Sequence, residues 1–203
     1  MLRYAITSRA LYPGDEREKQ ATLLRHASRW TADGIDLVQL REKDLHASDI
    51  AALALKILQF IAQTNSPTKL LINSRSDIAI ATRAHGVHLT SDRDELTATQ
   101  VRSLYASANL PPPVITVSCH TLDEVQRARE DHVDAVLFAP VFEKTLTDHV
   151  TIPGRGLEQL RAACNAAAPV TVYALGGVTL QNAPSCLEAG AAGIAGIRLF
   201  HDS

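Results

Sequence analysis

Short apolar runs alternate along this chain with segments of helical periodicity, and this alternation limits the possible folds more than any other feature. Eight runs occur among the 203 residues: RYAIT, IDLVQL, KLLIN, GVHL, VITVS, AVLFAP, VTVYAL and GIAGI. Runs that are apolar throughout, rather than at every second residue, are typical of parallel strands covered on both faces. Eight β/α units predict an α/β fold, the (β/α)8 TIM barrel, with a doubly wound open sheet as the alternative.

Helix signals lie between these runs. An apolar stripe at i, i+3 and i+4 spacing covers residues 50–61, with Ser48 as its expected N-cap. A capping box predicts another helix start at Thr121. A further helix is expected to begin at Thr179 and to end at Gly190, where glycine suits the C-terminal cap.

The final β/α unit is short. Only Arg198 to Ser203 follow the eighth run, so the last helix of the barrel should be truncated or absent. A missing helix would leave an apolar seam that a second subunit could cover, and we therefore expect a possible homodimer. The length fits a single domain over residues 1–203.

Composition excludes several classes of function. A net charge of −2 gives no basic face for nucleic acid or an acidic membrane. No run reaches the roughly 18 apolar residues that a membrane span needs. Cys119, Cys164 and Cys186 are widely spaced and form no CxxC pair, which indicates neither a disulfide framework nor a zinc site and favours the reducing cytoplasm.

Polar residues at the ends of strands predict the site, because barrels of this kind do their chemistry at the carboxyl ends of their strands. The second run ends in VQLREKD, where alternation directs Gln39, Arg41 and Lys43 to one side and Glu42 to the other. A guanidinium fork beside an ammonium suits an anion such as pyrophosphate. A solvated loop with a surface ion pair is the alternative for such a motif.

A second anion site is predicted at the opposite end of the chain. Gly176 and Gly177 would let backbone N–H groups approach a phosphate at the start of the next helix. Arg198, just past Gly196 and Ile197, would add positive charge. Phosphate sites after the last two strands recur in this architecture, so both anion sites should face one cavity.

Three further strand ends offer polar groups. Asn73 and Ser74 follow the third run, although an Asn there is often only a turn former. His88 alternates with apolar neighbours, which favours a packed, hydrogen-bonded histidine over a ligand. Asp92 and Asp94 could bind a metal or could simply stabilise a helix N-terminus.

The fifth and sixth runs complete the set. Ser118 and His120 end the fifth run, and the pKa range of histidine makes His120 the best acid/base candidate. Residues 142–156 form the longest irregular stretch, and loops of that length are often lids or binding loops.

The motifs together resemble a known family. YAIT, VQLREK, INSRSDIA, AHGVHL, VSCHTLDEV, APVFEK, GRGLEQL, ALGGVT and AGAAGIAGI match, in order and spacing, the superfamily of thiamine phosphate synthase and thiazole tautomerase. The match covers Tyr4 to Ile197 and implies the (β/α)8 barrel. In the synthase, pyrophosphate leaves an aminopyrimidine methylene group with Mg2+ assistance, and the nitrogen of a thiazole phosphate captures the resulting cation.

The resemblance also implies roles for individual residues. The pyrimidine diphosphate would be held by Gln39, Arg41, Lys43 and Asn73, with Ser118 bonding the pyrophosphate. The thiazole phosphate would lie against Gly177, Ile197 and Arg198. These roles agree with the two anion sites argued from the residues alone.

Three positions depart from the synthase pattern. Ser74 stands where the family has one magnesium-binding Asp, and Arg93, flanked by Asp92 and Asp94, stands where it has the other. A hydroxyl and a guanidinium weaken a hard-cation site, although a shift of one residue could still bring a carboxylate near the ion. Lys144 lies three places before the expected position of the family's catalytic-loop lysine, and it could substitute for that lysine in catalysis or only resemble it.

Two other interpretations remain open. The tautomerase branch commonly lacks the aspartates and reads VFE after the sixth strand, as this chain does, and its acid/base histidine aligns with His120. That reaction needs no metal, but it would leave QLREK without a diphosphate to bind. A non-catalytic binder of thiamine phosphate is the third interpretation, because both anion sites are present while the metal site is altered.

Overall fold

The computed structural model describes residues 1–92, 94–145 and 151–201. Within them, eight parallel strands form a closed barrel in the spatial order β1-β10-β9-β6-β5-β4-β3-β2. The barrel strands are β1 (Leu2–Ile6), β2 (Leu37–Leu40), β3 (Lys69–Asn73), β4 (Gly86–Leu89), β5 (Val114–Cys119), β6 (Ala135–Phe138), β9 (Thr171–Ala174) and β10 (Gly193–Gly196). The predicted barrel is confirmed, since closure between β1 and β10 rules out an open sheet.

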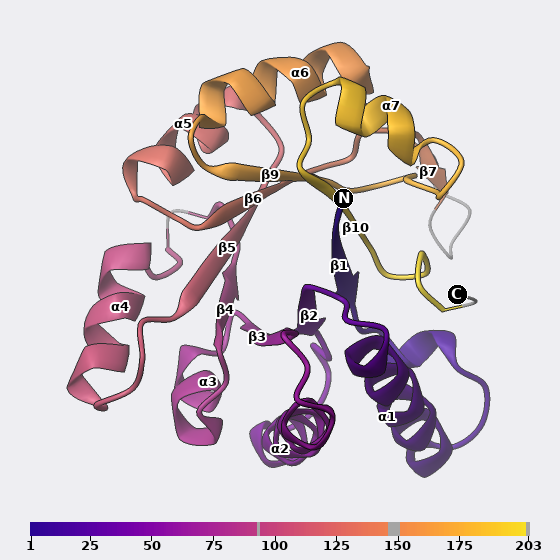
Figure 1. The fold of residues 1–203 in the computed structure, drawn as a ribbon, viewed down its shortest axis with the longest axis vertical. Coiled ribbons are helices and arrows are strands. Elements are labelled where there is room, and N and C mark those ends of the chain that lie inside the picture. The colour runs from indigo at the N-terminus through magenta and orange to yellow at the C-terminus, as the bar shows by residue number, and fades with distance from the viewer. Residues whose placement is uncertain (93, 146–150, 202–203) are drawn as a thin grey trace.

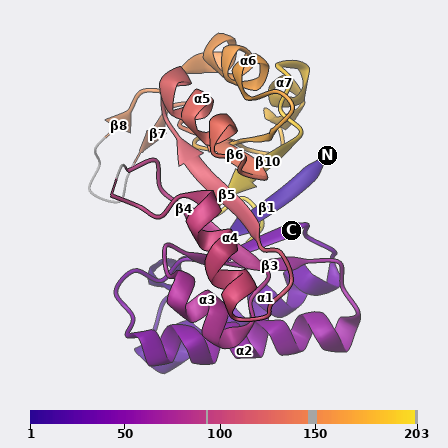
Figure 2. The same ribbon diagram turned by 90° about the vertical axis from the view of Figure 1, so that its left-hand side faces the viewer.

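Helices surround the barrel on its outer side (Figure 1). They are α1 (Glu16–Ala32), α2 (Ala47–Thr64), α3 (Ser76–Thr82), α4 (Ala98–Ser107), α5 (Leu122–Glu130), α6 (Gly156–Ala167) and α7 (Ala183–Glu188), with a 3-10 turn, η1 (Arg9–Leu11), after β1. The turned view shows α1 to α3 on one side of the strands and α5 to α7 on the other (Figure 2).

The helix starts differ in how well the sequence predicted them. The capping box at Thr121 is confirmed, because its side chain accepts the Glu124 N–H. Ser48 as N-cap is wrong: α2 begins at Ala47 after His46, whose side chain makes no capping bond. The first turn of this helix is therefore held without a side-chain cap among the residues described.

The last helix also starts later than Thr179. Thr179 and Asn182 bond each other's backbone N–H, as expected of a helix start. Pro184 has no N–H and interrupts the backbone ladder, so regular helix is found only from Ala183. Gly190, at φ +104°, follows the end of α7 as predicted.

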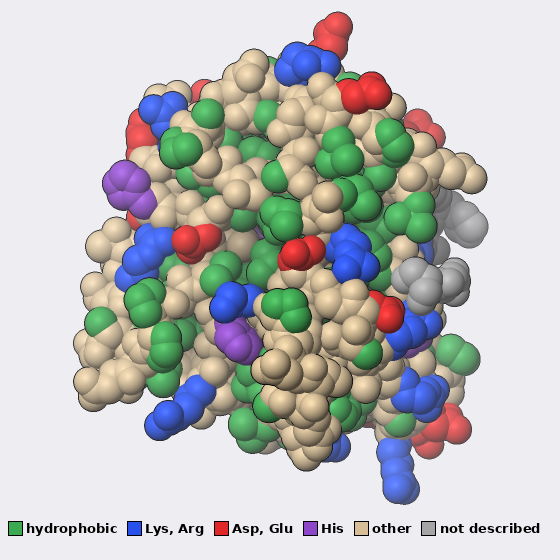
Figure 3. Space-filling model, in the orientation of Figure 1, with side chains coloured by type: hydrophobic (Ala, Val, Ile, Leu, Met, Phe, Trp, Pro, Cys, Tyr) green, Lys and Arg blue, Asp and Glu red, His purple; other side chains and the backbone are tan. Residues whose placement is uncertain are grey.

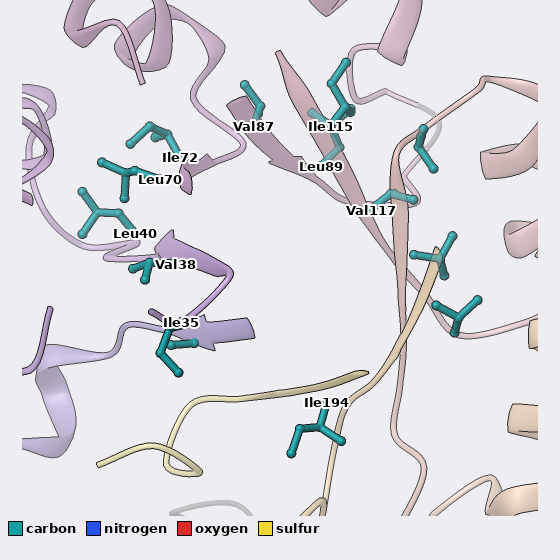
Figure 4. Close-up of a cluster of buried hydrophobic side chains, with 14 of the residues drawn as sticks. Ile35, Val38, Leu40, Leu70, Ile72, Val87, Leu89, Ile115, Val117 and Ile194 are labelled. Atoms are coloured by element: carbon teal, nitrogen blue, oxygen red, sulfur yellow. The ribbon is translucent and has the colours of Figure 1, made fainter. Parts of the chain in front are cut away.

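Two separate apolar layers fill the molecule. Outward-facing strand residues such as Val38, Leu70 and Ile194 pack against the helices (Figure 4). A smaller cluster fills the barrel interior and includes Tyr4 and Tyr173. Because strand side chains alternate, most strands contribute to both layers, which explains why most of the runs are apolar throughout. Strand β4 is the exception, since His88 takes the inward position there.

The ring of helices is open between α7 and α1, where the C-terminal segment lies (Figure 1). No helix follows β10 in the described part of the chain, which confirms the truncated last unit. Phe200 is 3% exposed, and its carbonyl accepts bonds from Trp30 Nε1 at 2.8 Å and Arg29 Nη2 at 2.9 Å. The C-terminal segment thus covers this seam. An exposed seam is therefore no longer a reason to expect a homodimer, and the homodimer itself stays a prediction.

The stretch after β6 is more ordered than the sequence suggested. Two short strands, β7 (Lys144–Thr145) and β8 (Thr151–Ile152), pair as an antiparallel ribbon. Its base is fixed by the Gly156 N–H, which donates to the Val141 carbonyl at 2.9 Å. The prediction of an entirely irregular loop over 142–156 is therefore wrong for the residues described.

Charged side chains of both signs are interspersed with apolar ones on the face seen in the space-filling view (Figure 3). Among the described residues, no helix combines the length and the apolar character that crossing a bilayer requires.

Candidate active site at the carboxyl rim of the barrel

The loop after β2 is anchored by a buried charge network that the sequence did not reveal. Arg9 and Glu42 form an ion pair at 3.1 Å, with side chains only 7% and 2% exposed. Thr7 Oγ1 donates to Glu42 Oε1 at 2.6 Å and accepts the Arg41 N–H at 2.9 Å. Arg9 also binds both carboxylate oxygens of Asp44, at 2.7 and 2.8 Å. These bonds tie the Arg41 loop to the end of β1.

Sequence alternation gave only one hint of this network, namely that Glu42 points away from Arg41. The partners lie 33 residues apart, at the ends of two paired strands, and no local pattern connects them. The register pairs Ile6 with Gln39, which brings the two strand ends together.

Gln39 lies just inside the barrel and is 1% exposed. Its Nε2 donates to Asn73 Oδ1 at 2.7 Å, and Asn73 Nδ2 donates to Ser74 Oγ at 3.3 Å. The Oε1 of Gln39 has no hydrogen-bond partner among the described residues. Buried acceptors are rarely left unpaired in folded proteins, so this atom is suited to accept an N–H from a ligand.

A cavity of about 320 Å³ opens beside these residues. It is lined by Leu40, Glu42, Lys43, Leu45, Ile50, Asn73, Ser74 and Arg75. Strand β2 ends at Leu40, so the alternation of strand side chains does not determine the direction of Lys43. Lys43 lines this cavity together with Ile50 of α2. Lys43 and Asn73 share the cavity wall, whereas Gln39 belongs to the barrel interior.

Three cations at the rim are free to bind a ligand. Within the described residues, Arg41, Lys43 and Arg198 form no ion pair, in contrast to Arg9 and Arg75. Arg41 and Arg198 follow β2 and β10, the two neighbours of β1 in the barrel. All barrel strands are parallel, so both arginines lie at the same rim, as predicted.

His88 is packed and hydrogen-bonded, as expected for this position. Its Nδ1 lies 2.8 Å from Thr116 Oγ1 and its Nε2 lies 2.9 Å from Ser118 Oγ. Burial, and then the charge of Arg41, lower the pKa of His88 to about 3, so the imidazole is neutral at physiological pH. Ser118, the predicted pyrophosphate contact, is thus held from inside the barrel.

His120 is exposed at the end of β5. Its Nδ1 donates to the Ala139 carbonyl at 2.7 Å, and its backbone N–H donates to Glu124. This bond leaves Nε2 as the ring nitrogen available for proton transfer, so the predicted acid/base role is compatible with the geometry and stays a prediction.

The glycine pair after β9 has a structural role that the sequence did not reveal. A Cβ at Gly176 would lie 2.7 Å from Pro140 Cα, and one at Gly177 would lie 2.5 Å from the Glu143 carbonyl oxygen. Both glycines therefore allow the loop after β6 to approach closely. The expectation that they open the next helix is wrong, because α7 starts only at Ala183.

The remaining residues of this second anion site are placed at the rim. Ile197 is half-buried against the interior cluster and Arg198 is exposed. Asn182 Nδ2 donates to the Gly177 carbonyl at 3.0 Å and fixes the turn after β9. The contribution of Gly176, Gly177, Ile197 and Arg198 to phosphate binding stays a prediction.

The donors around Ser74 do not fit a magnesium site. The cavity wall there carries the cations Lys43 and Arg75, while the carboxylate of Glu42 is occupied by Thr7 and Arg9. Mg2+ needs one or two carboxylates beside its phosphate ligands. Across the described residues, no group of three or more His, Cys, Asp and Glu side chains could hold a metal ion.

The predicted metal ligands lie on an exposed turn after β4. Asp92 Oδ1 accepts the backbone N–H of Asp94 at 3.3 Å, which gives Asp92 a local structural role. Arg93 lies outside the described residues, as does the side chain of Lys144, whose backbone belongs to β7. Metal binding by Asp92 and Asp94 and catalysis by Lys144 stay predictions.

Comparison with known proteins shows the family of this chain. The family model described as thiamine monophosphate synthase matches residues 4–200. The chain belongs to that family. It is 41% identical over 163 residues to a thiamine-phosphate synthase of Albidiferax ferrireducens, covering 80% of this chain and 69% of the relative. It is 32% identical over 197 residues to a putative thiamine-phosphate synthase 2 of Aquifex aeolicus, covering 97% and 96%.

A solved structure shares the fold. The thiamine phosphate pyrophosphorylase from Pyrococcus furiosus superposes with a TM-score of 0.78 at 23% identity, covering all of this chain and 88% of the other. At that identity the likeness supports the barrel alone. Neither of the two relatives above is named as a tautomerase.

Proposed function

We propose that this chain is a thiamine phosphate synthase, an enzyme that joins hydroxymethylpyrimidine diphosphate to thiazole phosphate and releases pyrophosphate. The observation that carries the proposal is the rim itself. It combines cations that pair with no described residue with a buried, unpartnered Gln39 oxygen, in a member of the thiamine monophosphate synthase family. Such a rim is complementary to an anion joined to a heterocycle that bears an N–H group.

The pyrimidine substrate fits the part of the carboxyl rim formed by β2 to β5. The Gln39 Oε1 accepts a hydrogen bond from the amino group of the pyrimidine, and Asn73 holds the Gln39 amide in the required orientation. Arg41, Lys43 and Ser118 bind the diphosphate. The bond between the methylene carbon and the diphosphate oxygen breaks, and its electron pair leaves with the pyrophosphate, whose growing charge the cations stabilise.

The thiazole phosphate fits the β9 and β10 side. Arg198 binds its phosphate beside the backbone of Gly176, Gly177 and Ile197. The lone pair of the thiazole nitrogen then forms the new bond to the methylene carbon, and no proton is transferred in this step. Holding both substrates at one rim places the nitrogen near the carbon that it attacks.

The family generally uses Mg2+, but no step of this proposal depends on it, because the donors around Ser74 do not fit the ion. Protein cations supply the positive charge instead. The small phosphorylated substrates make the cytoplasm the expected compartment, in agreement with three unpaired cysteine thiols.

A thiazole tautomerase is the second candidate. The observation that favours it is His120, whose Nδ1 is fixed by the Ala139 carbonyl while Nε2 is left for proton transfer. The free cations Arg41 and Lys43 favour the synthase, since an isomerase has no diphosphate to bind.

The test is an incubation with both synthase substrates, with Mg2+ in one sample and EDTA in another, following pyrophosphate release. Thiamine phosphate and pyrophosphate in both samples support the proposal in full, and product only with Mg2+ contradicts the metal-free step alone. No turnover, combined with isomerisation of thiazole carboxylate phosphate that His120→Ala abolishes, would establish the tautomerase. Binding without either reaction would identify a non-catalytic binder.

A further inference from the structure

A closed set of buried hydrogen bonds runs along the inside of the barrel and ends at Ser118. The Tyr4 hydroxyl lies 3.0 Å from Thr116 Oγ1 and 3.3 Å from His88 Nδ1. Thr116 Oγ1 lies 2.8 Å from the same Nδ1, and His88 Nε2 lies 2.9 Å from Ser118 Oγ. Tyr4 and Thr116 are fully buried and His88 is 4% exposed. Solvent therefore does not supply alternative partners.

Counting protons in this set assigns the histidine tautomer. Among the described residues, the hydroxyls of Tyr4 and Thr116 contact only each other and His88 Nδ1. If Nδ1 is bare, one hydroxyl donates to the other and the second donates to Nδ1, so both protons are used. If Nδ1 carries a proton, the set of three groups has three donors, namely Nδ1–H and the two hydroxyls, but only two acceptors, the two hydroxyl oxygens. No arrangement pairs all three donors, so one of them is buried without a partner, which is unfavourable.

The imidazole must also be neutral in this setting. The group has no carboxylate partner in the described part of the chain, and its burial and the nearby Arg41 both disfavour the imidazolium. A neutral ring with a bare Nδ1 carries its proton on Nε2. Nε2 therefore donates to Ser118 Oγ.

We infer that His88 is a positioning residue that fixes the Ser118 hydroxyl as a hydrogen-bond donor towards the diphosphate. The inference rests on the proposed function, which makes Ser118 a pyrophosphate contact. A serine hydroxyl has one proton. Because His88 Nε2 donates to the Ser118 oxygen, the Ser118 hydroxyl can donate its own proton to the anion. With the opposite tautomer, Ser118 would donate its proton to Nε2, and the lone pairs of its oxygen would face the negative charge.

The direct test is the tautomer of His88, measured on the full-length chain labelled with 15N-histidine, in long-range 1H–15N spectra at pH 7. The resonance is assigned by its loss in His88→Gln. A protonated Nε2 and a bare Nδ1 support the inference. A protonated Nδ1, or an imidazolium, overturns it. This spectrum requires no turnover, so a chain without synthase activity would refute the proposed function and still give the tautomer.

A matched pair of amide variants tests whether the donor acts through Ser118. Gln places an N–H near the position of Nε2, whereas Asn is too short to reach Ser118. We expect His88→Gln to bind inorganic pyrophosphate with an affinity within about threefold of that of the unmodified chain. His88→Asn should bind it about tenfold more weakly, which is the effect expected from losing one charge-assisted hydrogen bond. In Ser118→Ala, adding His88→Asn should change the affinity no further.

Equal pyrophosphate affinities for His88→Gln and His88→Asn would overturn the role of Ser118, provided that both variants unfold at temperatures close to that of the unmodified chain. If either variant fails to fold, Thr116→Val and Tyr4→Phe replace the pair. Each variant leaves one buried hydroxyl whose proton only a bare Nδ1 can accept, so a His88 proton that stays on Nε2 supports the inference. A shift of that proton to Nδ1 in either variant contradicts it.

Discussion

The two halves of the barrel rim are built in different ways. Above β2 to β5, the groups offered to a ligand are side chains that other side chains help to place: the Arg41 backbone N–H donates to Thr7, the Gln39 amide donates to Asn73, and Ser118 Oγ contacts His88. Above β9 and β10, the wall is mainly backbone, held close to the loop after β6 by two glycines. Buried side-chain networks preorganise charge. A backbone wall depends on the space that glycine leaves.

This difference predicts where single substitutions act. On the β2 to β5 side, removing a distant partner should disturb the site, because Arg41, Gln39 and Ser118 are each placed with the help of another side chain. On the β9 and β10 side, most side-chain changes should be tolerated, and only an added Cβ should disturb the wall.

The largest effect should come from the Arg9 and Glu42 pair. Arg9→Met would leave the buried Glu42 carboxylate without its cation, and we expect a loss of about 3–5 kcal/mol in the free energy of unfolding. The matched control is Arg75→Met, whose ion pair with Asp77 has side chains 42% and 64% exposed. Exposed pairs contribute about 0–1 kcal/mol. Similar losses in urea unfolding of the two variants would contradict the anchoring role of Arg9.

Arg41 should carry the largest share of catalysis among the free cations. Arg41→Ala should lower kcat/KM by about 10² or more, the usual result of removing charge stabilisation from a site that excludes water. Arg17→Ala, an exposed change in α1, is the control. A steady-state rate that Arg41→Ala leaves unchanged would remove Arg41 from the mechanism and make the rim on this side a solvated loop.

Two glycines with the same backbone angle sharpen the contrast on the other side. Gly177 and Gly34 both have φ +65°, but a Cβ at Gly34 would meet nothing within 4 Å. Gly34→Ala should cost only the backbone strain of about 1–2 kcal/mol, and Gly177→Ala should add about 1–3 kcal/mol for displacing the loop after β6. Thermal unfolding of both variants measures the difference. Equal losses of stability in the two variants would show that the loop after β6 can move away from an added Cβ at no cost.

The last prediction concerns pH, and its effect over one pH unit is the smallest of the four. His88 has a folded-state pKa of about 3 against an ordinary value of 6.5, so below pH 6.5 the unfolded chain binds a proton that the folded chain does not. His88 should therefore lower stability as pH falls from 6.5 towards 3, by about 1.4 kcal/mol per pH unit at most. His88→Gln should remove this part of the acid dependence. Parallel stability curves for both proteins between pH 6.5 and 5 would contradict the buried neutral state.

The sequence predicted the barrel architecture well, but it did not predict the buried hydrogen bonds and ion pairs that hold the site residues in place. Periodicity and apolar runs depend on local rules, so the eight strands and the rim positions of Arg41 and Arg198 followed directly. The Arg9 and Glu42 pair and the His88 set join residues that are 28 or more positions apart, and only the barrel register brings them together. Thr179 failed as a regular helix start because Pro184 interrupts the ladder.

The glycine pair shows the same limit. Gly176 and Gly177 were expected to let a phosphate approach, which stays a prediction, and their missing side chains also make room for the Pro140 and Glu143 backbone. A glycine in a sequence indicates close approach. The approaching group becomes known only from the fold.

A crystal structure of the chain with pyrophosphate and thiazole phosphate, in the absence of Mg2+, would show directly whether one rim binds both substrates. We expect both anions at the same rim, with pyrophosphate within hydrogen-bonding distance of Arg41, Lys43 and Ser118, and with the thiazole phosphate at Gly177 and Arg198. Anions bound away from this rim, or a pyrophosphate that binds only after Mg2+ is added and through Asp92 or Asp94, would contradict this expectation.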